Sequence, residues 1–167
     1  MSLKKDKSSN LKKKFMKLAL DLAIQNNRLT GLNPSVGCVL TDQDEIISYG
    51  KTDYNGRPHA EVVTLNQDFK NNKKTKLFVT LEPCVHYGKT PPCTNIIVKK
   101  KVKSVNYSIE DYDKRTKSKS KNVLRKNNIS SNVGILKNDV SEFYKEYKFS
   151  KLKNLPYVSG KLAISKN

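Results

Sequence analysis

The stretch Thr80-Leu81-Glu82-Pro83-Cys84-Val85-His86-Tyr87-Gly88-Lys89-Thr90-Pro91-Pro92-Cys93 is the most informative part of this chain. It supplies two thiols, and the upstream tripeptide His59-Ala60-Glu61 supplies an imidazole and a carboxylate. Zinc takes nitrogen and sulfur ligands in a tetrahedron, and a catalytic zinc site receives three ligands from the protein. We therefore predict that His59, Cys84 and Cys93 bind Zn2+ and leave the fourth position to water.

Glu61 is the candidate for proton transfer at this site. It stands two residues after His59, close enough to exchange a proton with the water. Zinc lowers the pKa of a bound water from about 15.7 to about 7. Glu61 would take the released proton and pass it to a ring nitrogen and then to a departing amine. The predicted chemistry is metal-assisted hydrolysis, and deamination in particular.

A structural zinc site is the alternative that these residues leave open. His86 is the other histidine of the chain. As a fourth protein ligand it would close the site, because structural zinc sites are filled by four protein ligands. The two cysteines could also be ordinary core residues, and a lone His-x-Glu is a weak signal.

Hydrophobic patterning around these motifs predicts a single α/β domain. After an opening hairpin, strands alternate with helices, which is typical of a sheet covered by helices on both faces. Asp139 and Glu142 form a capping-box pattern before the last helix. The sequence predicts helices over residues 11–27, from Pro58-His59, from Pro92-Cys93, over about 117–127 and after Asp139, and strands over 36–41, 45–49, 76–81, 103–109, 131–136 and 155–164.

The net charge of +18 first suggests a nucleic-acid partner. Of the 33 basic residues, however, only Arg28, Arg57, Arg115 and Arg125 are arginine. Phosphate-reading surfaces rely on the bidentate fork of arginine. A general bias toward Lys and Asn codons explains the charge, so we expect no nucleic-acid partner. The charge would still attract a phosphorylated small-molecule substrate.

Cysteine usage and hydropathy predict a cytoplasmic protein without a membrane segment. Two of the three cysteines belong to the predicted metal site, and Cys38 lies in an apolar run, where we expect a buried small hydrophobe. Nothing resembles a disulfide framework, which fits a reducing compartment. No run approaches the roughly 18 apolar residues of a membrane span.

Two further motifs, Asn33-Pro34-Ser35-Val36-Gly37-Cys38 and Gly56-Arg57-Pro58-His59-Ala60-Glu61-Val62, accompany the cysteine stretch. Together these motifs closely resemble the deaminase domain of the bifunctional riboflavin-biosynthesis deaminase/reductase, the diaminohydroxyphosphoribosylaminopyrimidine deaminase. The long insert 85–92 differs from the Pro-Cys-x-x-Cys of cytidine and tRNA adenosine deaminases. The resemblance is strong from about residue 15 to 111 and weak afterwards.

The resemblance implies a three-layer α/β/α cytidine-deaminase-like fold with a central mixed sheet. It also implies hydrolysis of 2,5-diamino-6-ribosylamino-4(3H)-pyrimidinone 5′-phosphate to 5-amino-6-ribosylamino-2,4-pyrimidinedione 5′-phosphate and ammonia. By position, His59, Cys84 and Cys93 match the zinc ligands, and Glu61 matches the catalytic acid and base. The family further implies self-association, as a dimer or a tetramer.

The resemblance also implies substrate contacts from Asn33, His86 and Lys89, with His86 facing the substrate rather than the metal. Lys89 would suit a phosphate as a point charge. Each has a structural alternative: Asn33 before Pro34 is typical of a turn, and Lys89 is one of many lysines. We expect Glu82 to hold the loop in place rather than to do chemistry.

The loop after residue 110 departs from the family. Asp111 is retained, and both Asp111 and Asp113 are expected to bind the substrate, although Asp113 replaces an asparagine and would be able to repel a phosphate. A Gly-x-Gly of the family aligns with Ser118 and Ser120, so this loop has lost the backbone freedom of glycine.

Three segments are predicted along the chain. Residues 1–10 are expected to be disordered, and residues 11–150 to form the zinc-dependent deaminase domain. Residues 151–167 form a tail that resembles the start of the family's reductase domain, which is absent. The chain is either a fragment of a two-domain protein or a deaminase-only protein, and we expect no reductase activity from it.

Other functions remain open at this point. The altered loop 111–120 motivates a deaminase of another free base, nucleoside or nucleotide. The charge motivates a tRNA-binding or tRNA-deaminating protein, although aromatic residues are not interleaved with the lysines. A catalytically inactive zinc domain kept for assembly is a third possibility.

Overall fold

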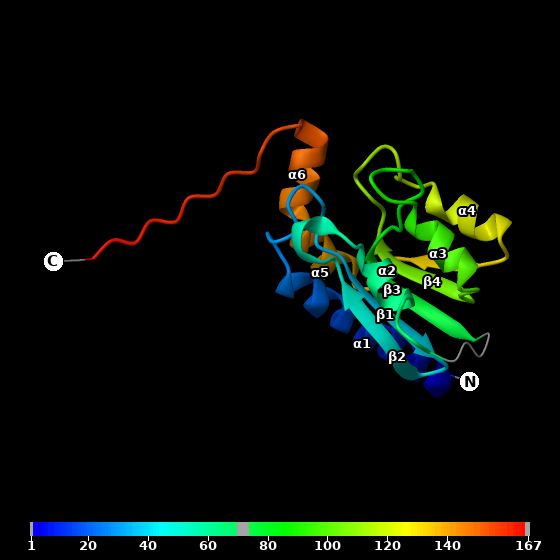
Figure 1. The fold of residues 1–167 in the computed structure, drawn as a ribbon. Helices are drawn as coiled ribbons and strands as arrows, with labels where there is room; N and C mark the ends of the chain where they lie inside the picture. Colours follow the sequence, from blue (N-terminus) through cyan, green and yellow to red (C-terminus); the bar gives the residue numbers. More distant parts are fainter. Residues whose placement is uncertain (1, 70–73, 166–167) are drawn as a thin grey trace.

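A five-stranded mixed sheet forms the centre of the computed structural model, which describes residues 2–69 and 74–165 (Figure 1). The strands lie in the order β2-β1-β3-β4-β5. β1 pairs antiparallel with both β2 and β3, whereas β3, β4 and β5 are parallel. The strands are β1 (Gly37–Asp42), β2 (Glu45–Lys51), β3 (Thr75–Leu81), β4 (Ser104–Ile109) and β5 (Ser130–Val133).

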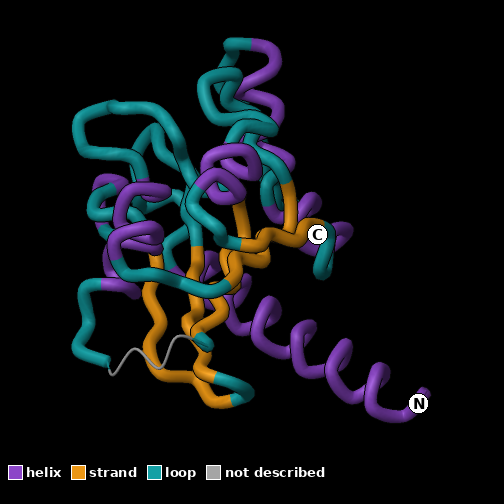
Figure 2. Tube along the Cα trace, turned by 90° about the vertical axis from the view of Figure 1, so that its right-hand side faces the viewer, coloured by secondary structure: helices purple, strands orange, loops and turns teal. Residues whose placement is uncertain are grey.

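Helices cover both faces of the sheet, as predicted. On one face, Phe15, Met16 and Ala19 of the first helix pack against Val39 and Phe78 of the sheet, and Figure 2 shows this long N-terminal helix on one side of the strands. The opposite side chains of β1 and β3 pack in a second cluster with the next two helices. The helices are α1 (Ser2–Gln25), α2 (Ala60–Leu65), α3 (Cys93–Lys99), α4 (Ser120–Lys126), α5 (Lys137–Phe143) and α6 (Lys145–Lys153), with a short 3-10 helix η1 at Tyr54–Gly56.

The central strands are buried on both faces. Every residue of β1 is buried, and β3 is buried except at Lys76. This pattern arises because the strands in the middle of a sheet covered on both faces carry continuous apolar runs. Cys38 is fully buried in β1, which confirms the expectation of a small core residue. Within the described residues, no helix combines the length and the apolarity that a membrane crossing requires.

The N-terminal segment differs from the prediction. Residues 2–10 belong to α1, which begins at Ser2, and are not disordered. The segment contains neither Pro nor Gly and is rich in Lys, a good helix former, so nothing in it ends the helix early. Met1, the first residue of the predicted disordered segment, lies outside the described residues.

The C-terminal part differs at two points. The capping box of Asp139 and Glu142 does not form, because α5 begins already at Lys137, after Leu136 in the left-handed conformation. The strand predicted over residues 155–164 is wrong: the segment is exposed and extends away from the domain (Figure 1). A β-strand requires a hydrogen-bonded neighbour, and within the described residues the five-stranded sheet does not include this segment.

Gly37 sets how closely α1 approaches the sheet. A Cβ atom at this position would lie 1.8 Å from the carbonyl oxygen of Ala19 and 2.9 Å from the backbone nitrogen of Ala23. Both contacts involve helix backbone, which cannot rotate away as a flexible side chain would. Glycine at the start of β1 is therefore required by close helix–strand packing.

We predict that Gly37→Ala lowers the free energy of unfolding by at least about 1–3 kcal/mol, the usual cost of overpacking a core. Urea unfolding followed by circular dichroism measures this difference. Gly160→Ala is the matched control, since a Cβ there meets nothing within 4 Å. An unchanged unfolding midpoint for Gly37→Ala would contradict the packing argument.

Candidate metal centre

Two of the three predicted zinc ligands lie at the starts of helices, and the third lies in a loop. His59 immediately precedes α2, and Cys93 is the first residue of α3. Cys84 lies in the loop that follows β3. Helix starts present free N–H groups and the positive end of the helix dipole, which favour thiolates. The backbone N–H of Cys93 donates to the Cys84 sulfur over 3.1 Å.

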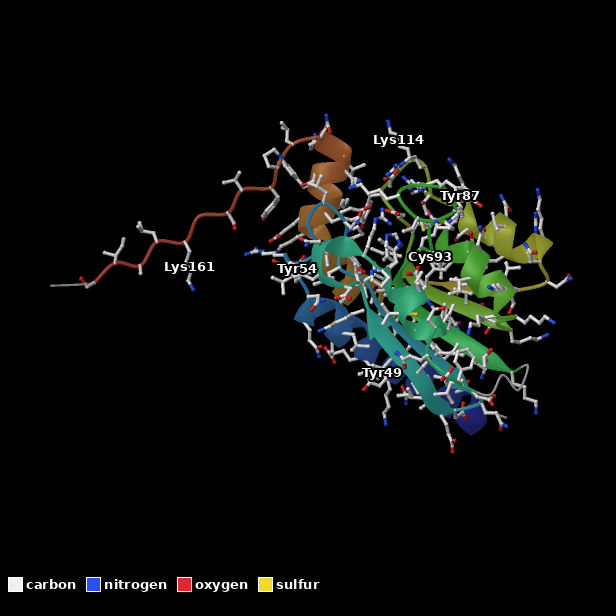
Figure 3. All side chains as sticks on the ribbon, viewed as in Figure 1. Tyr49, Tyr54, Tyr87, Cys93, Lys114 and Lys161 are labelled. Atoms are coloured by element: carbon white, nitrogen blue, oxygen red, sulfur yellow. The ribbon has the colours of Figure 1, made fainter. Side chains whose placement is uncertain are left out.

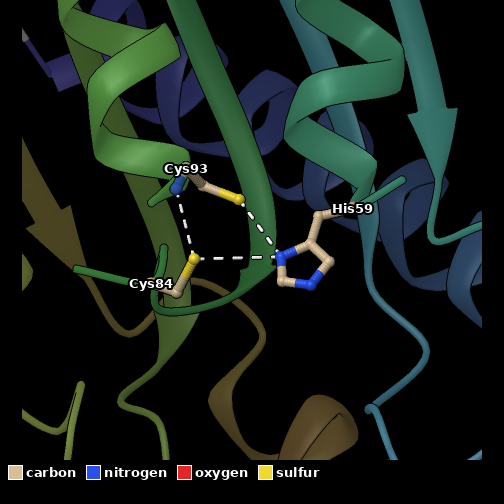
Figure 4. A group of neighbouring side chains, drawn as sticks. All are labelled: His59, Cys84 and Cys93. Carbon is tan, nitrogen blue, oxygen red and sulfur yellow. Dashed lines mark hydrogen bonds between the residues drawn. The ribbon is translucent and has the colours of Figure 1, made fainter. Parts of the chain in front are cut away.

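The ligand atoms are spaced as zinc requires (Figure 4). His59 Nδ1 lies 3.3 Å from Cys93 Sγ and 3.8 Å from Cys84 Sγ, and all three ligand atoms lie within 4.8 Å of one another. Tetrahedral zinc with usual bond lengths separates nitrogen and sulfur ligands by about 3.6 Å. The donor set and its spacing therefore fit Zn2+.

Electrostatic coupling within the group also favours a metal. The hydrogen bond that the Cys93 side chain donates lowers the pKa of the Cys84 thiol to about 4. The same bond, together with burial, raises the pKa of Cys93. One thiol therefore ionises readily at the expense of the other. A divalent cation removes this competition, because a coordinating thiol is deprotonated outright.

Glu61 lies beside this group, in the first turn of α2. Its side chain is buried, with 4% of the residue exposed. Burial, followed by the charge of Cys84, raises the pKa of the Glu61 carboxyl to about 7. A group with a pKa near neutrality both accepts and donates protons efficiently.

A cavity of about 390 Å³ adjoins the metal centre. Its volume lies within the usual range of about 300–1,000 Å³ for small-molecule sites. The sequence-predicted residues that line it are Asn33, His59, Glu61, Cys84, His86, Lys89, Asp111 and Asp113. Cys93, which is 1% exposed, is the one predicted residue that does not line the cavity. The structure thus brings the predicted site residues together, while their individual roles stay predictions.

His86 is separate from the metal ligands. Its Nδ1 lies 3.0 Å from Thr116 Oγ1, and among the described residues the metal-ligand group consists of His59, Cys84 and Cys93. The geometry therefore does not favour the alternative in which His86 closes the site as a fourth ligand.

Several lining residues were not singled out from the sequence. Arg57 donates to Thr90 Oγ1 over 2.6 Å, and its Nη1 lies 3.3 Å from His59 Nε2. Arg57 lies in the same sequence motif as His59, so its place near the metal centre could have been predicted from the sequence. Arg115, Tyr147 and Lys151 also line the cavity, but they belong to no motif.

Glu82 organises the loop 111–120. Its Oε2 accepts from the backbone N–H groups of Asp111 (3.1 Å) and Ser118 (2.9 Å), and its Oε1 accepts from that of Ser120 (2.9 Å). Ser118 has a φ of 61°, the left-handed conformation that glycine adopts at lower cost. Glu82 thus holds the loop 111–120, and its carboxylate stabilises a turn without glycine.

This fold and this site define a zinc-binding deaminase domain, and comparison with known proteins agrees. Residues 9–109 match the family described as the cytidine and deoxycytidylate deaminase zinc-binding region. The chain is 33% identical over 133 residues to a diaminohydroxyphosphoribosylamino-pyrimidine deaminase of Buchnera aphidicola, covering 80% of this chain and 90% of that protein. The chain therefore belongs to the cytidine and deoxycytidylate deaminase zinc-binding family, and within it to the diaminohydroxyphosphoribosylaminopyrimidine deaminases.

Longer relatives share the same domain. The chain is 38% identical to the riboflavin biosynthesis protein RibD of Haemophilus influenzae over 151 residues, which is 90% of this chain and 41% of that protein. RibD of Acinetobacter baumannii superposes with a TM-score of 0.84 at 32% identity, over 90% of this chain and 42% of that one. The chain thus spans less than half the length of these relatives. Their shared structure confirms the predicted cytidine-deaminase-like fold.

We predict that Glu82→Ala loosens the loop 111–120, because three backbone N–H groups lose their acceptor. Each such loss costs about 1–3 kcal/mol when the donor stays buried. Hydrogen exchange at the amides of Ser118 and Ser120 measures the effect, and we expect their protection to fall at least tenfold. Glu45→Ala, in the exposed β1–β2 hairpin, is the control. Unchanged protection in Glu82→Ala would show that the loop does not depend on this carboxylate.

Proposed function

We propose that this protein deaminates 2,5-diamino-6-ribosylamino-4(3H)-pyrimidinone 5′-phosphate in riboflavin biosynthesis, giving 5-amino-6-ribosylamino-2,4-pyrimidinedione 5′-phosphate and ammonia. The observation that carries this proposal is the His59–Cys84–Cys93 group with Glu61 beside it, opening into one cavity. The names of the relatives, RibD and the diaminohydroxyphosphoribosylamino-pyrimidine deaminase, support the choice of substrate.

In this proposal His59, Cys84 and Cys93 hold Zn2+. A zinc ion held by these ligands would lower the pKa of a bound water to about 7. Glu61 accepts one proton from the attacking water and donates it to the ring nitrogen, and it then transfers the second proton, from the new hydroxyl group, to the leaving amino group. A carbon–oxygen bond forms at the amino-bearing carbon and the carbon–nitrogen bond breaks, so the reaction needs neither an oxidant nor a reductant.

The remaining cavity residues bind and orient the substrate. Asn33, His86, Lys89 and Asp111 line the same cavity as Glu61. His86 is held by Thr116, and Asp111 accepts from Tyr147 Oη over 2.9 Å. Fixed side chains of this kind lower the entropic cost of placing the amino-bearing carbon beside the water.

The proposal also covers the domain boundaries, the cellular location and the self-association of the enzyme. Residues 11–150 form the deaminase domain, and residues 151–167 resemble the start of the family's reductase domain. The absence of a disulfide pattern supports a cytoplasmic location. Self-association as a dimer or tetramer follows from the family resemblance.

We predict that Cys93→Ala abolishes stoichiometric zinc binding, because a three-ligand site that loses a thiolate loses most of its affinity. Metal analysis of the purified protein measures zinc per chain. Cys38→Ala removes an equally buried thiol outside the group and is expected to keep about one zinc per chain. Equal zinc content in the two variants would refute the ligand assignment.

We predict that Glu61→Gln keeps its zinc and its fold but loses about 10²–10⁴-fold in kcat, the usual contribution of general acid–base catalysis. Ammonia release from the diaminopyrimidinone ribotide phosphate measures turnover, with cytidine and guanine as competing substrates. If the wild-type protein prefers cytidine or guanine, the proposed substrate is wrong. Full activity of Glu61→Gln would instead remove the proton-transfer role.

A further inference from the structure

Asp113, the residue that departs from the family pattern, is paired with two cations. Its Oδ2 lies 2.6 Å from Arg115 Nη2 and 3.3 Å from Lys151 Nζ. Arg115 Nε also lies 3.0 Å from Oδ1, so the arginine donates hydrogen bonds to both carboxylate oxygens. The Arg115 guanidinium holds the pKa of Asp113 well below its usual range. The carboxylate therefore stays ionised and acts as an anchor for both cations.

The trio carries a net positive charge at the cavity. One carboxylate faces one guanidinium and one ammonium, and all three side chains line the cavity that contains Glu61. Asp113 accepts from only some of the N–H donors of Arg115 and Lys151, because a guanidinium has five N–H groups and an ammonium has three. Arg115 and Lys151 thus keep unused donors, and the repulsion expected between Asp113 and a phosphate is offset.

The two cations come from separate parts of the chain. Arg115 belongs to the loop 111–120, which Glu82 fixes, and Lys151 belongs to α6. Lys151 Nζ also lies 5.6 Å from the centre of the Tyr147 ring, and the Lys151 side chain is one-third exposed. The loop 111–120 and α6, which are distant in sequence, therefore place Arg115 and Lys151 side by side. Both side chains remain partly accessible to a ligand.

We propose that Arg115 and Lys151, held together by Asp113, bind the phosphate ester of the substrate. This proposal rests on the proposed function for the identity of the substrate, but the pair itself requires only a phosphate monoester. Arginine supplies planar, paired donors that match phosphate oxygens, and lysine adds a point charge. Asp113 then acts as a positioning residue rather than as a direct phosphate contact.

The test uses binding and turnover together. Arg115→Gln and Lys151→Met are each expected to weaken binding of ribose 5-phosphate about tenfold, measured by calorimetry against ribose. For turnover, we expect KM for the phosphorylated substrate to rise about tenfold, with kcat changed by less than threefold. The dephosphorylated nucleoside should show no change, because it lacks the group that the two cations bind.

Two lysines serve as matched controls. Lys114 neighbours Arg115 but points into solvent at the outer side of the domain, whereas Cys93 lies inside it (Figure 3). Lys153 lies on α6 two residues from Lys151 and is exposed. Neither lines the cavity. Lys114→Met and Lys153→Met remove the same charge and should match the wild-type protein in every assay.

The outcomes separate this proposal from the proposed function. Loss of ribose 5-phosphate binding in the variants, without wild-type turnover, would support the phosphate site and refute the substrate. Turnover with unchanged KM and unchanged ribose 5-phosphate binding in a variant that carries both Arg115→Gln and Lys151→Met would keep the function and overturn the phosphate site. If the variants lose activity equally toward the phosphorylated and the dephosphorylated substrate, the phosphate site is also overturned, because such losses indicate a structural role. Failure of the wild-type protein to bind ribose 5-phosphate would overturn it as well.

Discussion

The site depends on the position of β3, which pairs antiparallel with β1 and parallel with β4. Because β2 is antiparallel to β1, it runs parallel to β3, and the segments after β2, β3 and β4 all emerge at one edge of the sheet. The segment before β1 starts at this edge too. Binding sites in α/β sheets form at such carboxyl ends. The pairing of one strand thus brings the metal centre, Asn33 and the loop 111–120 together.

The local chemistry of this edge could be predicted from the sequence, whereas contacts between distant segments could not. His59, Glu61, Cys84 and Cys93 combine rare residue types at informative spacings, and the structure places all four together. Lys151 carries no such signal in a chain where most of the 33 basic residues are lysine. The strand predicted over residues 155–164 failed for the same reason. The segment has the apolar content of a strand, but a strand also needs a hydrogen-bonded neighbour, which composition does not reveal.

The loop 111–120 shows how contacts made elsewhere compensate for local changes. Ser118 adopts a left-handed conformation although it is not glycine, which costs a non-glycine residue about 1–3 kcal/mol. The buried Glu82 carboxylate accepts three N–H groups of the loop and stabilises this turn. Asp113 introduces a negative charge into the loop, and Arg115 and Lys151 compensate it. The altered loop is therefore ordered by charge rather than by glycine.

The charge that matters for substrate selection is local rather than global. The net charge of +18 belongs to the chain as a whole, and salt screens exposed charges beyond about 8–10 Å. Two of the acidic groups at the cavity already have hydrogen-bond donors: Glu82 accepts from backbone N–H groups, and Asp111 accepts from Tyr147 and the N–H of Asp113. Burial raises the pKa of Asp111, so its anionic form is further disfavoured. Arg115 and Lys151 keep unused donors at the cavity, so the phosphate of the proposed substrate would be attracted to this side of the site. In the proposed reaction, that preference would direct the uncharged ring toward Glu61 and the metal ligands.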